Sequence, residues 1–325
     1  MTDFELYVLE EHVEDFNDGI ISRRELLRRV TLITGSLAAT LTILDVMGCG
    51  STPSGTPASP VSRASSTPQP FATPPAQATT NGVTVEPTDP RIRVETLAVN
   101  GADGASLMSY AARPAGGKPA GGILVVHENR GLLEHIKDVV RRVATAGFTG
   151  LSIDLLSRDG GAVKLSDPAA YAAALGKRAV PDMVSDLMQA LSALRSASGI
   201  GDKLGITGFC FGGGMVWNTL IAGAQVKAAV PFYGPKPADI TNLANTRAAV
   251  FAIYAEQDTA ITATRTDMEA ALLQAKAKAG GQPYQIMVYP GVGHAFHNDT
   301  GARYNAVQAE AAWVATVEWM RKYVH

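Results

Sequence analysis

The residue with the clearest chemical potential is Cys210, which stands between glycines in the hexapeptide Gly-Phe-Cys-Phe-Gly-Gly, residues 208–213. A short apolar run, residues 203–207, precedes the hexapeptide, and a helix-like stretch, residues 215–219, follows it. This layout holds a thiol on a tight turn between a strand and a helix, and the glycines leave room around its strained backbone. The helix N-terminus would also favour a thiolate. Because a free cysteine is otherwise a small buried apolar residue, Cys210 needs partners to act as a nucleophile.

Two residues further along the chain are candidates for those partners. The buried-strand pattern of residues 248–254 leads to Asp258, and an acid just beyond a buried strand is well placed to orient a base. A second strand pattern, residues 284–289, is followed by a glycine-rich loop that carries His294. The chain order is therefore nucleophile, acid and base, with each residue after a predicted strand. The sequence predicts a Cys-His-Asp triad.

These motifs resemble those of the dienelactone hydrolase family, especially when His-Glu-Asn-Arg-Gly at residues 127–131 is included. The other matching motifs are Glu-Gln-Asp at residues 256–258 and Gly-His-Ala-Phe at residues 293–296. The similarity runs from about Arg93 to the C-terminus. It implies an α/β-hydrolase fold and hydrolysis of a cyclic enol-lactone ester, carboxymethylenebutenolide, or of related esters, through a covalent acyl-enzyme.

The resemblance also implies a role for each matching residue. Cys210 would be the nucleophile and His294 the base, with Asp258 orienting the imidazole. Glu128 matches the family's glutamate after the third strand, which pairs with the resting thiol; the alternative is an exposed loop glutamate. In this fold two backbone amides form the oxyanion hole, one after the nucleophile and one after the third strand. The corresponding residues are Phe211 and Asn129.

One departure from the family concerns the charge of the substrate. Dienelactone-cleaving members carry an arginine shortly after the triad histidine, where it binds the substrate carboxylate, and the matching position here is Asn298. An amide does not supply the charged bidentate fork of a guanidinium. The substrate-binding candidates are Asn298 and Arg130, with Arg158 and Arg303 as further cations unless they are ordinary surface residues. We therefore expect an ester or lactone hydrolase, with dienelactone itself in doubt as the substrate.

The N-terminal region has the features of an export signal. Arg23 and Arg24 precede an uncharged run, residues 30–44, which resembles a twin-arginine signal. The run is shorter than the roughly 20 residues that span a bilayer. Residues 46–49 read Val-Met-Gly-Cys, which resembles a lipobox that ends at Cys49. We expect an exported protein that is anchored to the membrane by a lipid on Cys49; ordinary cleavage or an uncleaved anchor are the alternatives.

The chain is predicted to have three parts. Residues 1–49 form the signal and lipobox-like segment, and residues 50–90 form a Ser/Thr/Pro-rich tether that buries too little apolar surface to be ordered. Residues 91–325 form the catalytic domain. Apolar runs alternate there with helical stretches, which predicts a doubly wound, mostly parallel sheet, and residues 91–112 should add antiparallel edge strands.

Several other function classes find little support. The net charge is −2, without a basic patch that contains aromatic residues, so nucleic acid is a poor partner. No phosphate-binding or dinucleotide fingerprint and no His-Glu-x-x-His motif occurs, so neither a cofactor nor a metal is expected.

The expected partners are a small ester or lactone and, through the lipid on Cys49, a membrane. The protein is expected to be a monomer. The competing function is a membrane-tethered binding or redox-sensing lipoprotein, in which Cys210 is oxidised or inert.

Overall fold

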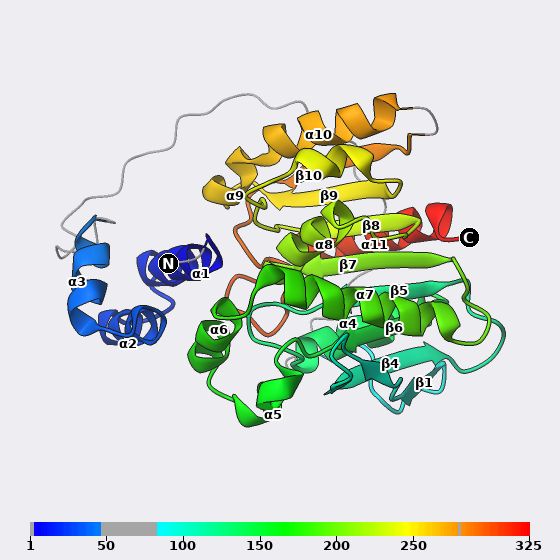
Figure 1. Ribbon diagram of the computed structural model, residues 1–325, viewed down its shortest axis with the longest axis horizontal. Coiled ribbons are helices and arrows are strands. Elements are labelled where there is room, and N and C mark those ends of the chain that lie inside the picture. The colour runs from blue at the N-terminus through cyan, green and yellow to red at the C-terminus, as the bar shows by residue number, and fades with distance from the viewer. Residues whose placement is uncertain (1–2, 47–82, 279–280) are drawn as a thin grey trace. The chain divides into compact units, whose positions relative to one another are not determined.

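The computed structural model describes residues 3–46, 83–278 and 281–325 (Figure 1). Contacts between residues divide the chain into two compact units. The larger unit comprises Met1–Val8 and Thr79–His325, and the smaller unit comprises Leu9–Ala78.

The described residues of the smaller unit are mostly helical. This unit contains most of α1 (Asp3–Asn17), together with α2 (Arg23–Thr34) and α3 (Leu37–Val46). Within the described residues no single helix is long and apolar enough to cross a membrane. The pair α2 and α3 reaches that length and composition together, but the two helices are bent by 113° at the break between them. Cys49 of the predicted lipobox lies outside the described residues.

The larger unit is built on an eight-stranded sheet with the order β1-β4-β6-β5-β7-β8-β9-β10. β1 pairs with β4 and β4 with β6 in the antiparallel direction, and the remaining neighbours are parallel. The predicted mostly parallel sheet with antiparallel strands on the N-terminal side is therefore confirmed. The strands are β1 (Ile92–Glu95), β4 (Ser109–Pro114), β5 (Gly122–Val126), β6 (Thr149–Ile153), β7 (Leu204–Phe209), β8 (Ala228–Phe232), β9 (Ala249–Ala255) and β10 (Tyr284–Tyr289).

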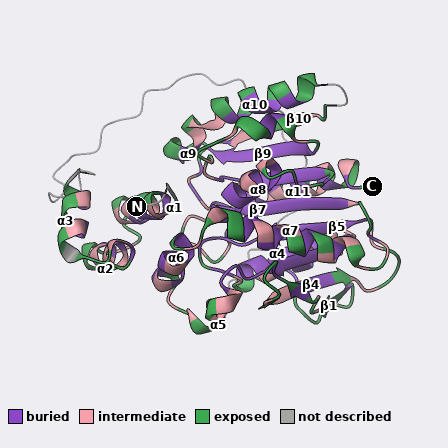
Figure 2. Ribbon diagram, in the orientation of Figure 1, coloured by how far each residue is buried: buried purple, intermediate pink, exposed green. Residues whose placement is uncertain are grey.

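Helices cover both faces of the sheet, with α7 and α8 in front of it and α11 behind it in Figure 1. Strands β5 to β9 are buried along their whole length, as Figure 2 shows, because a parallel sheet covered on both faces needs apolar residues on both sides. The helices are α4 (Glu134–Thr145), α5 (Gly161–Lys164), α6 (Pro168–Gly176), α7 (Val180–Ser196), α8 (Phe211–Ile221), α9 (Thr259–Ala263), α10 (Arg265–Ala277) and α11 (Ala306–Tyr323). A separate two-stranded sheet pairs β2 (Val99–Asn100) with β3 (Ser106–Leu107).

The structure differs from the predicted elements in two places. The pattern of residues 168–195 predicts one helical stretch, but the structure divides it into α6 and α7, and a proline lies in the first turn of α7. Proline lacks the backbone N–H that a helix interior requires, so it favours a new helix start. The pattern that begins at residue 262 also predicts one helical stretch, and the structure has α9 and α10 there.

The ordered chain also begins earlier than residue 91, where we expected the tether to end. The backbone N–H and the hydroxyl of Thr84 donate to the Asp138 carboxylate at 3.0 and 2.8 Å, and the N–H of Val85 donates to the same carboxylate at 2.8 Å. Val85 is buried. A segment that packs in this way on α4 belongs to the folded part, whereas residues 50–82 of the predicted tether lie outside the described residues.

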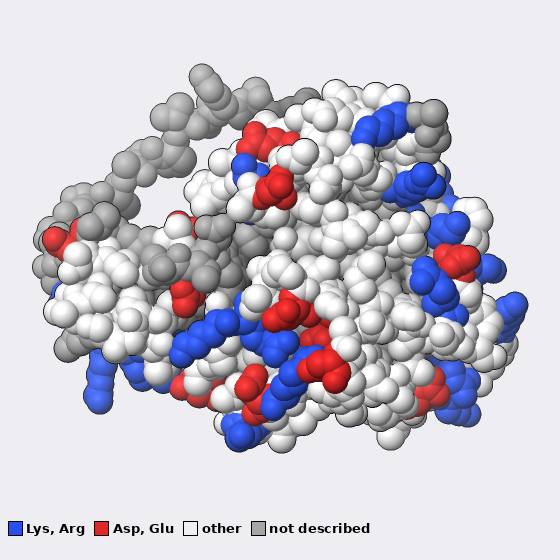
Figure 3. Space-filling view, viewed as in Figure 1, with Lys and Arg blue, Asp and Glu red and all other residues white. Residues whose placement is uncertain are grey.

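Charged side chains of both signs gather in the lower middle of the face shown in Figure 3, whereas Lys and Arg predominate along its right edge. Arg158 donates to Asp103 at 2.7 Å and to Asp186 at 2.6 Å. The Arg158 guanidinium is thus held in an ion-pair cluster with two aspartates. This pairing does not favour Arg158 as a cation that replaces the family's substrate-binding arginine.

Candidate active site

The C-terminal ends of β5, β7, β9 and β10 lie along the same edge of the sheet, because these strands are parallel neighbours. In open α/β sheets ligands bind at this edge. Glu128 follows β5, Cys210 follows β7, Asp258 follows β9 and His294 follows β10. The fold therefore brings residues that are far apart in the sequence to one edge, and all four are at least 94% buried.

Cys210 occupies the turn between β7 and α8 in a conformation that side chains rarely adopt, with φ 58° and ψ −126°. The glycines on either side are required by close contacts. An added Cβ at Gly208 would meet the carbonyl of Gly212, and one at Gly212 would lie 2.6 Å from the carbonyl oxygen of His127. Cys210 is also the N-cap residue of α8, so its sulfur lies at the positive end of that helix. The strained turn and the helix end together suit a nucleophilic thiol.

His294 and Asp258 form a buried pair. The Nδ1 of His294 lies 2.7 Å from Oδ2 of Asp258, and the two side chains are 3% and 4% exposed. A carboxylate accepts hydrogen bonds, so Nδ1 carries the proton and Nε2 is the basic nitrogen. The sulfur of Cys210 lies within 4.8 Å of a ring nitrogen of His294. A thiol, an imidazole and a buried carboxylate therefore lie together at this edge, the set of groups that nucleophilic catalysis requires.

Tyr7 also reaches this site, although the sequence analysis did not single it out. Its hydroxyl lies 3.1 Å from the sulfur of Cys210 and 3.3 Å from Nε2 of His294. Tyr7 belongs to the stretch Met1–Val8, which groups with the larger unit. One oxygen atom therefore lies within hydrogen-bonding distance of both the thiol and the imidazole. A tyrosine 203 residues before Cys210 leaves no local signal in the sequence.

Glu128 is paired with Asn298 in the structure. The Nδ2 of Asn298 donates to Oε2 of Glu128 at 2.5 Å, while Oε1 of Glu128 has no hydrogen-bond partner among the described residues. The other end of the Asn298 amide accepts from the backbone N–H and the hydroxyl of Thr300, at 3.0 and 2.7 Å. Asn298, which we expected to bind substrate, is therefore turned toward Glu128 with both ends of its amide engaged.

The other predicted site residues follow β5 and β7. Asn129 and Phe211 are buried, at 8% and 2% exposure, next to Glu128 and Cys210 respectively. Arg130 is exposed. The two amides proposed for the oxyanion hole thus belong to neighbouring strand ends, because Val126 in β5 pairs with Gly208 in β7.

Three non-glycine residues of the described chain have positive φ angles, and all follow strands at this edge: Cys210, Tyr233 and Ala295. The Tyr233 ring meets the His294 ring edge-on, with 5.0 Å between the centroids. Burial, together with the nearby charge of Glu128, raises the pKa of Tyr233 well above its ordinary value. Strained backbone tends to collect at functional sites. Residue type alone does not reveal a positive φ angle, so sequence reasoning missed Tyr233 and Ala295.

A second buried polar cluster connects α4 with the loop after β10. The Nδ1 of His135 lies 2.8 Å from Oδ1 of Asp299, whose other oxygen forms an ion pair with Arg142. Burial alone would raise the pKa of Asp299, but the hydrogen bond from His135 and the charge of Arg142 outweigh burial and lower it. His297 packs against this cluster; burial lowers its pKa well below the ordinary value, and neither of its ring nitrogens has a hydrogen-bond partner among the described residues.

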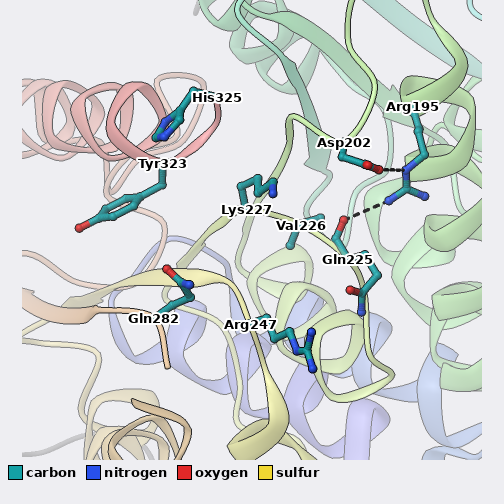
Figure 4. A pocket seen from close by; sticks show the side chains of 9 residues that line it. All are labelled: Arg195, Asp202, Gln225, Val226, Lys227, Arg247, Gln282, Tyr323 and His325. Carbon is teal, nitrogen blue, oxygen red and sulfur yellow. Dashed lines mark hydrogen bonds and ion pairs between the residues drawn. The ribbon is translucent and has the colours of Figure 1, made fainter. Parts of the chain in front are cut away.

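The opposite edge of the sheet carries a hollow of about 840 Å³ (Figure 4). Its lining includes Lys227, Arg247 and Gln282, which precede β8, β9 and β10 respectively. Arg195 lies there too and is bound by Asp202 at 2.9 Å, as the dashed line in Figure 4 shows. This hollow lies at the N-terminal ends of the parallel strands, so it is separate from the edge that carries Cys210.

Known proteins with similar sequences and folds agree with this architecture. Residues 107–324 match the model of the dienelactone hydrolase family. A Methylorubrum extorquens protein, provisionally named carboxymethylenebutenolidase, is 36% identical over 230 residues, which cover 66% of this chain and 76% of that protein. An Escherichia coli protein with the same provisional name is 35% identical over 236 residues, covering 68% of this chain and 84% of that protein.

Among solved structures, a Klebsiella pneumoniae protein provisionally named dienelactone hydrolase superposes with a TM-score of 0.63 at 29% identity. The match covers 71% of this chain and 99% of that structure. Members of this family are hydrolases that act on lactones and esters. By the extent of the matched sequence and by the fold, this chain belongs to the dienelactone hydrolase family.

Proposed function

We propose that this hydrolase cleaves small carboxylic esters or lactones with Cys210 as the nucleophile, His294 as the base and Asp258 as the residue that orients the base. The observation that supports this most directly is the buried hydrogen bond of 2.7 Å between His294 and Asp258, with the Cys210 sulfur within 4.8 Å of the same imidazole. A binding or redox-sensing role is not favoured, because a chain of this family does not need the full set of acid, base and nucleophile for binding alone.

The reaction proceeds in two halves. In the first, Nε2 of His294 takes the proton of the thiol, and the Cys210 sulfur attacks the carbonyl carbon of the substrate. The carbonyl oxygen becomes an oxyanion, which the backbone amides of Phe211 and Asn129 stabilise. When the oxyanion collapses, the C–O bond to the alcohol breaks, and the imidazolium returns its proton to the departing alkoxide. A thioester on Cys210 remains; from a lactone, the released alcohol stays attached to the same acyl group.

In the second half, His294 takes a proton from water, and the resulting hydroxide attacks the thioester carbonyl. The C–S bond breaks, the carboxylic acid leaves, and the thiolate recovers the proton held by His294. Asp258 keeps the proton of the imidazole on Nδ1 and stabilises the imidazolium that forms in each half. Atoms and charges balance over the cycle, and no component besides substrate and water is consumed.

The substrate that best suits this site is a neutral ester or lactone. Asn298 stands where carboxylate-binding relatives have an arginine, and its amide is engaged by Glu128 and Thr300. Glu128 keeps one oxygen, Oε1, without a hydrogen-bond partner among the described residues. We propose that this oxygen pairs with the resting thiol and is displaced by substrate, so that thiolate appears only when substrate is bound.

The experiment that tests this function is hydrolysis of p-nitrophenyl acetate and of neutral lactones by wild-type protein and by Cys210→Ala. We expect turnover by wild-type protein, its loss after alkylation with iodoacetamide, and no turnover by the variant. Circular dichroism and the melting temperature serve as the control, because removing one sulfur atom at the site edge should leave the fold intact. Full activity in Cys210→Ala would show that another residue is the nucleophile.

We also propose that the chain is exported by the twin-arginine route and anchored by a lipid on Cys49. The support is the Arg23–Arg24 pair ahead of an uncharged run, and the lipobox-like residues 46–49. Replacing both arginines by lysine should leave the protein in the cytoplasm, and Cys49→Ala should release the exported protein from the membrane fraction. Mass spectrometry that finds Cys49 unmodified in a full-length chain would refute the anchor.

A further inference from the structure

His127 is a fully buried histidine beside the active site that takes no part in the reaction proposed above. It is 0% exposed and follows β5, one residue before Glu128. Its Nδ1 lies 2.6 Å from the carbonyl oxygen of Glu128, and the backbone N–H of Leu155 donates to its Nε2 at 3.1 Å. Both ring nitrogens are therefore engaged by the backbone, one on each side of the ring.

These two backbone partners determine which nitrogen carries the proton. The N–H of Leu155 only donates, so Nε2 must accept; the carbonyl of Glu128 only accepts, so Nδ1 must donate. Tyr171 does not change this assignment, because its hydroxyl donates to Asp154 at 2.6 Å. Burial lowers the pKa of His127, against the opposing charge of Asp154, so the imidazole stays neutral.

The hydrogen bond from His127 orients a peptide group rather than a side chain. The carbonyl of Glu128 and the N–H of Asn129 belong to the same peptide unit, and in a trans peptide these two groups point in opposite directions. A carbonyl held at 2.6 Å by Nδ1 therefore directs the N–H of Asn129 away from the imidazole. The N–H of Gly131 also donates to this carbonyl, at 3.2 Å, so the peptide is held from two sides.

The same imidazole also packs on the second half of the oxyanion hole. Its ring stacks on that of Phe211, with 6.2 Å between the centroids and 29° between the planes. The backbone of Gly212 in α8 also lies close to the backbone of His127. A Cβ added at Gly212 would lie only 2.6 Å from the carbonyl oxygen of His127. The first turn of α8 therefore packs on His127, through the Phe211 ring and through the backbone of Gly212.

We propose that His127 is a positioning residue of the oxyanion hole: it turns the Glu128–Asn129 peptide so that the Asn129 N–H faces the substrate oxygen, and it supports the turn that presents the Phe211 N–H. This inference rests on the proposed Cys210 mechanism. Donors that are fixed in advance stabilise the charge that develops in the transition state more than the neutral carbonyl of the ground state. Losing His127 should therefore lower kcat and kcat/KM together and leave KM nearly unchanged.

The experiment compares His127→Leu, which removes both hydrogen bonds, with His127→Asn, whose amide can still donate to the Glu128 carbonyl. We expect kcat for p-nitrophenyl acetate to fall about 100-fold in His127→Leu, the scale of losing one oxyanion donor, and clearly less in His127→Asn. Inhibition by a trifluoromethyl ketone, which forms a tetrahedral adduct with the thiol, should weaken in parallel with kcat.

Alkylation of Cys210 by iodoacetamide separates this role from general damage, because displacement of iodide creates no oxyanion. Its rate should stay at the wild-type value in both variants. Tyr171→Phe is the matched control, since it disturbs the same buried cluster but leaves the bond from His127 to Glu128; its kcat should stay near wild type. The proposal is overturned if folded His127→Asn and His127→Leu both keep wild-type kcat, or if alkylation falls in proportion to kcat.

Failure of the underlying mechanism would look different. If Cys210 is not the nucleophile, alkylation of wild-type protein leaves turnover intact. If only the role of His127 is wrong, alkylation abolishes turnover and the His127 variants behave like wild type.

Discussion

Two histidine–aspartate pairs among the described residues have nearly identical geometry. In one, Nδ1 of His294 lies 2.7 Å from Asp258; in the other, Nδ1 of His135 lies 2.8 Å from Asp299. In each pair the histidine side chain is 3% exposed and the aspartate side chain 4% exposed. Neither the hydrogen bond nor the burial distinguishes the pair that we assign to catalysis from the other.

The difference lies on the far side of each imidazole. Nε2 of His294 lies 3.3 Å from the Tyr7 hydroxyl, and the Cys210 sulfur is within 4.8 Å of the ring. Nε2 of His135 has no hydrogen-bond partner among the described residues, and its ring packs on those of Phe209 and His297, at centroid distances of 5.9 and 5.7 Å. A buried histidine–aspartate pair is thus a candidate base only when a nucleophile faces its second nitrogen.

The largest expected effect comes from breaking the first pair. Asp258→Asn should lower kcat about 10⁴-fold, because an amide favours the wrong imidazole tautomer and does not stabilise the imidazolium. Steady-state hydrolysis of p-nitrophenyl acetate measures this, and urea unfolding checks that the variant is folded. A variant with wild-type kcat would remove Asp258 from the mechanism.

The same substitution in the second pair should act on stability instead. Asp299→Asn removes the charge that Arg142 and His135 share, and breaking a buried ion pair from one side costs about 3 kcal/mol. We expect the free energy of unfolding in urea to fall by that amount, while kcat of the folded variant stays near wild type. A large loss of kcat without destabilisation would mean that the second pair also serves catalysis.

The cluster around the second pair also predicts how stability depends on pH. Burial lowers the pKa of His297 and of His127, so each histidine is neutral when folded but takes up a proton on unfolding below about pH 6.5. The unfolded state then binds more protons, and stability should fall as the pH falls from about 6.5, by about 1.4 kcal/mol per pH unit for each histidine.

Asp299 should contribute to this dependence only in stronger acid. Its pKa is lowered in the folded protein, so its contribution is complete above about pH 4 and is lost as the pH falls through the folded value. Urea unfolding between about pH 5.5 and 7.5 therefore measures the slope where Asp299 is ionised in both states and does not contribute. His297→Phe should reduce the slope by about 1.4 kcal/mol per pH unit; an unchanged slope would mean that His297 does not stay neutral when folded.

The smallest effect should come from the acid two residues before Asp258. Glu256 is exposed, and its Oε2 accepts the N–H of Gly291 at 2.8 Å, a role that the oxygen of a glutamine can also fill. Glu256→Gln should therefore change kcat by less than about twofold, as ordinary surface substitutions do. A strong loss of activity would show that Glu256, rather than Asp258, is the acid of the first pair.

The sequence predicted the parts of the site that follow strands. Cys210, Asp258 and His294 stand after apolar runs, and the shared edge of a parallel sheet brings such residues together. The second pair has no comparable sequence signal, because His135 lies inside a helix rather than after a strand, and Asp299 is 164 residues away from it. The pairing of Asn298 with Glu128 was missed for the same reason, since a contact between two loops depends on how both loops fold.

Positive φ angles at Cys210, Tyr233 and Ala295 have a consequence for protein engineering. Each such residue costs on the order of 1–3 kcal/mol, which the packing of the rest of the domain must offset. Glycine adopts these angles without that steric penalty, so a selection for heat tolerance would be drawn to Ala295, whereas glycine at the fully buried Tyr233 would also remove a packed aromatic ring. Variants chosen in this way would loosen the loops beside His294, and their gain in melting temperature would be accompanied by slower turnover.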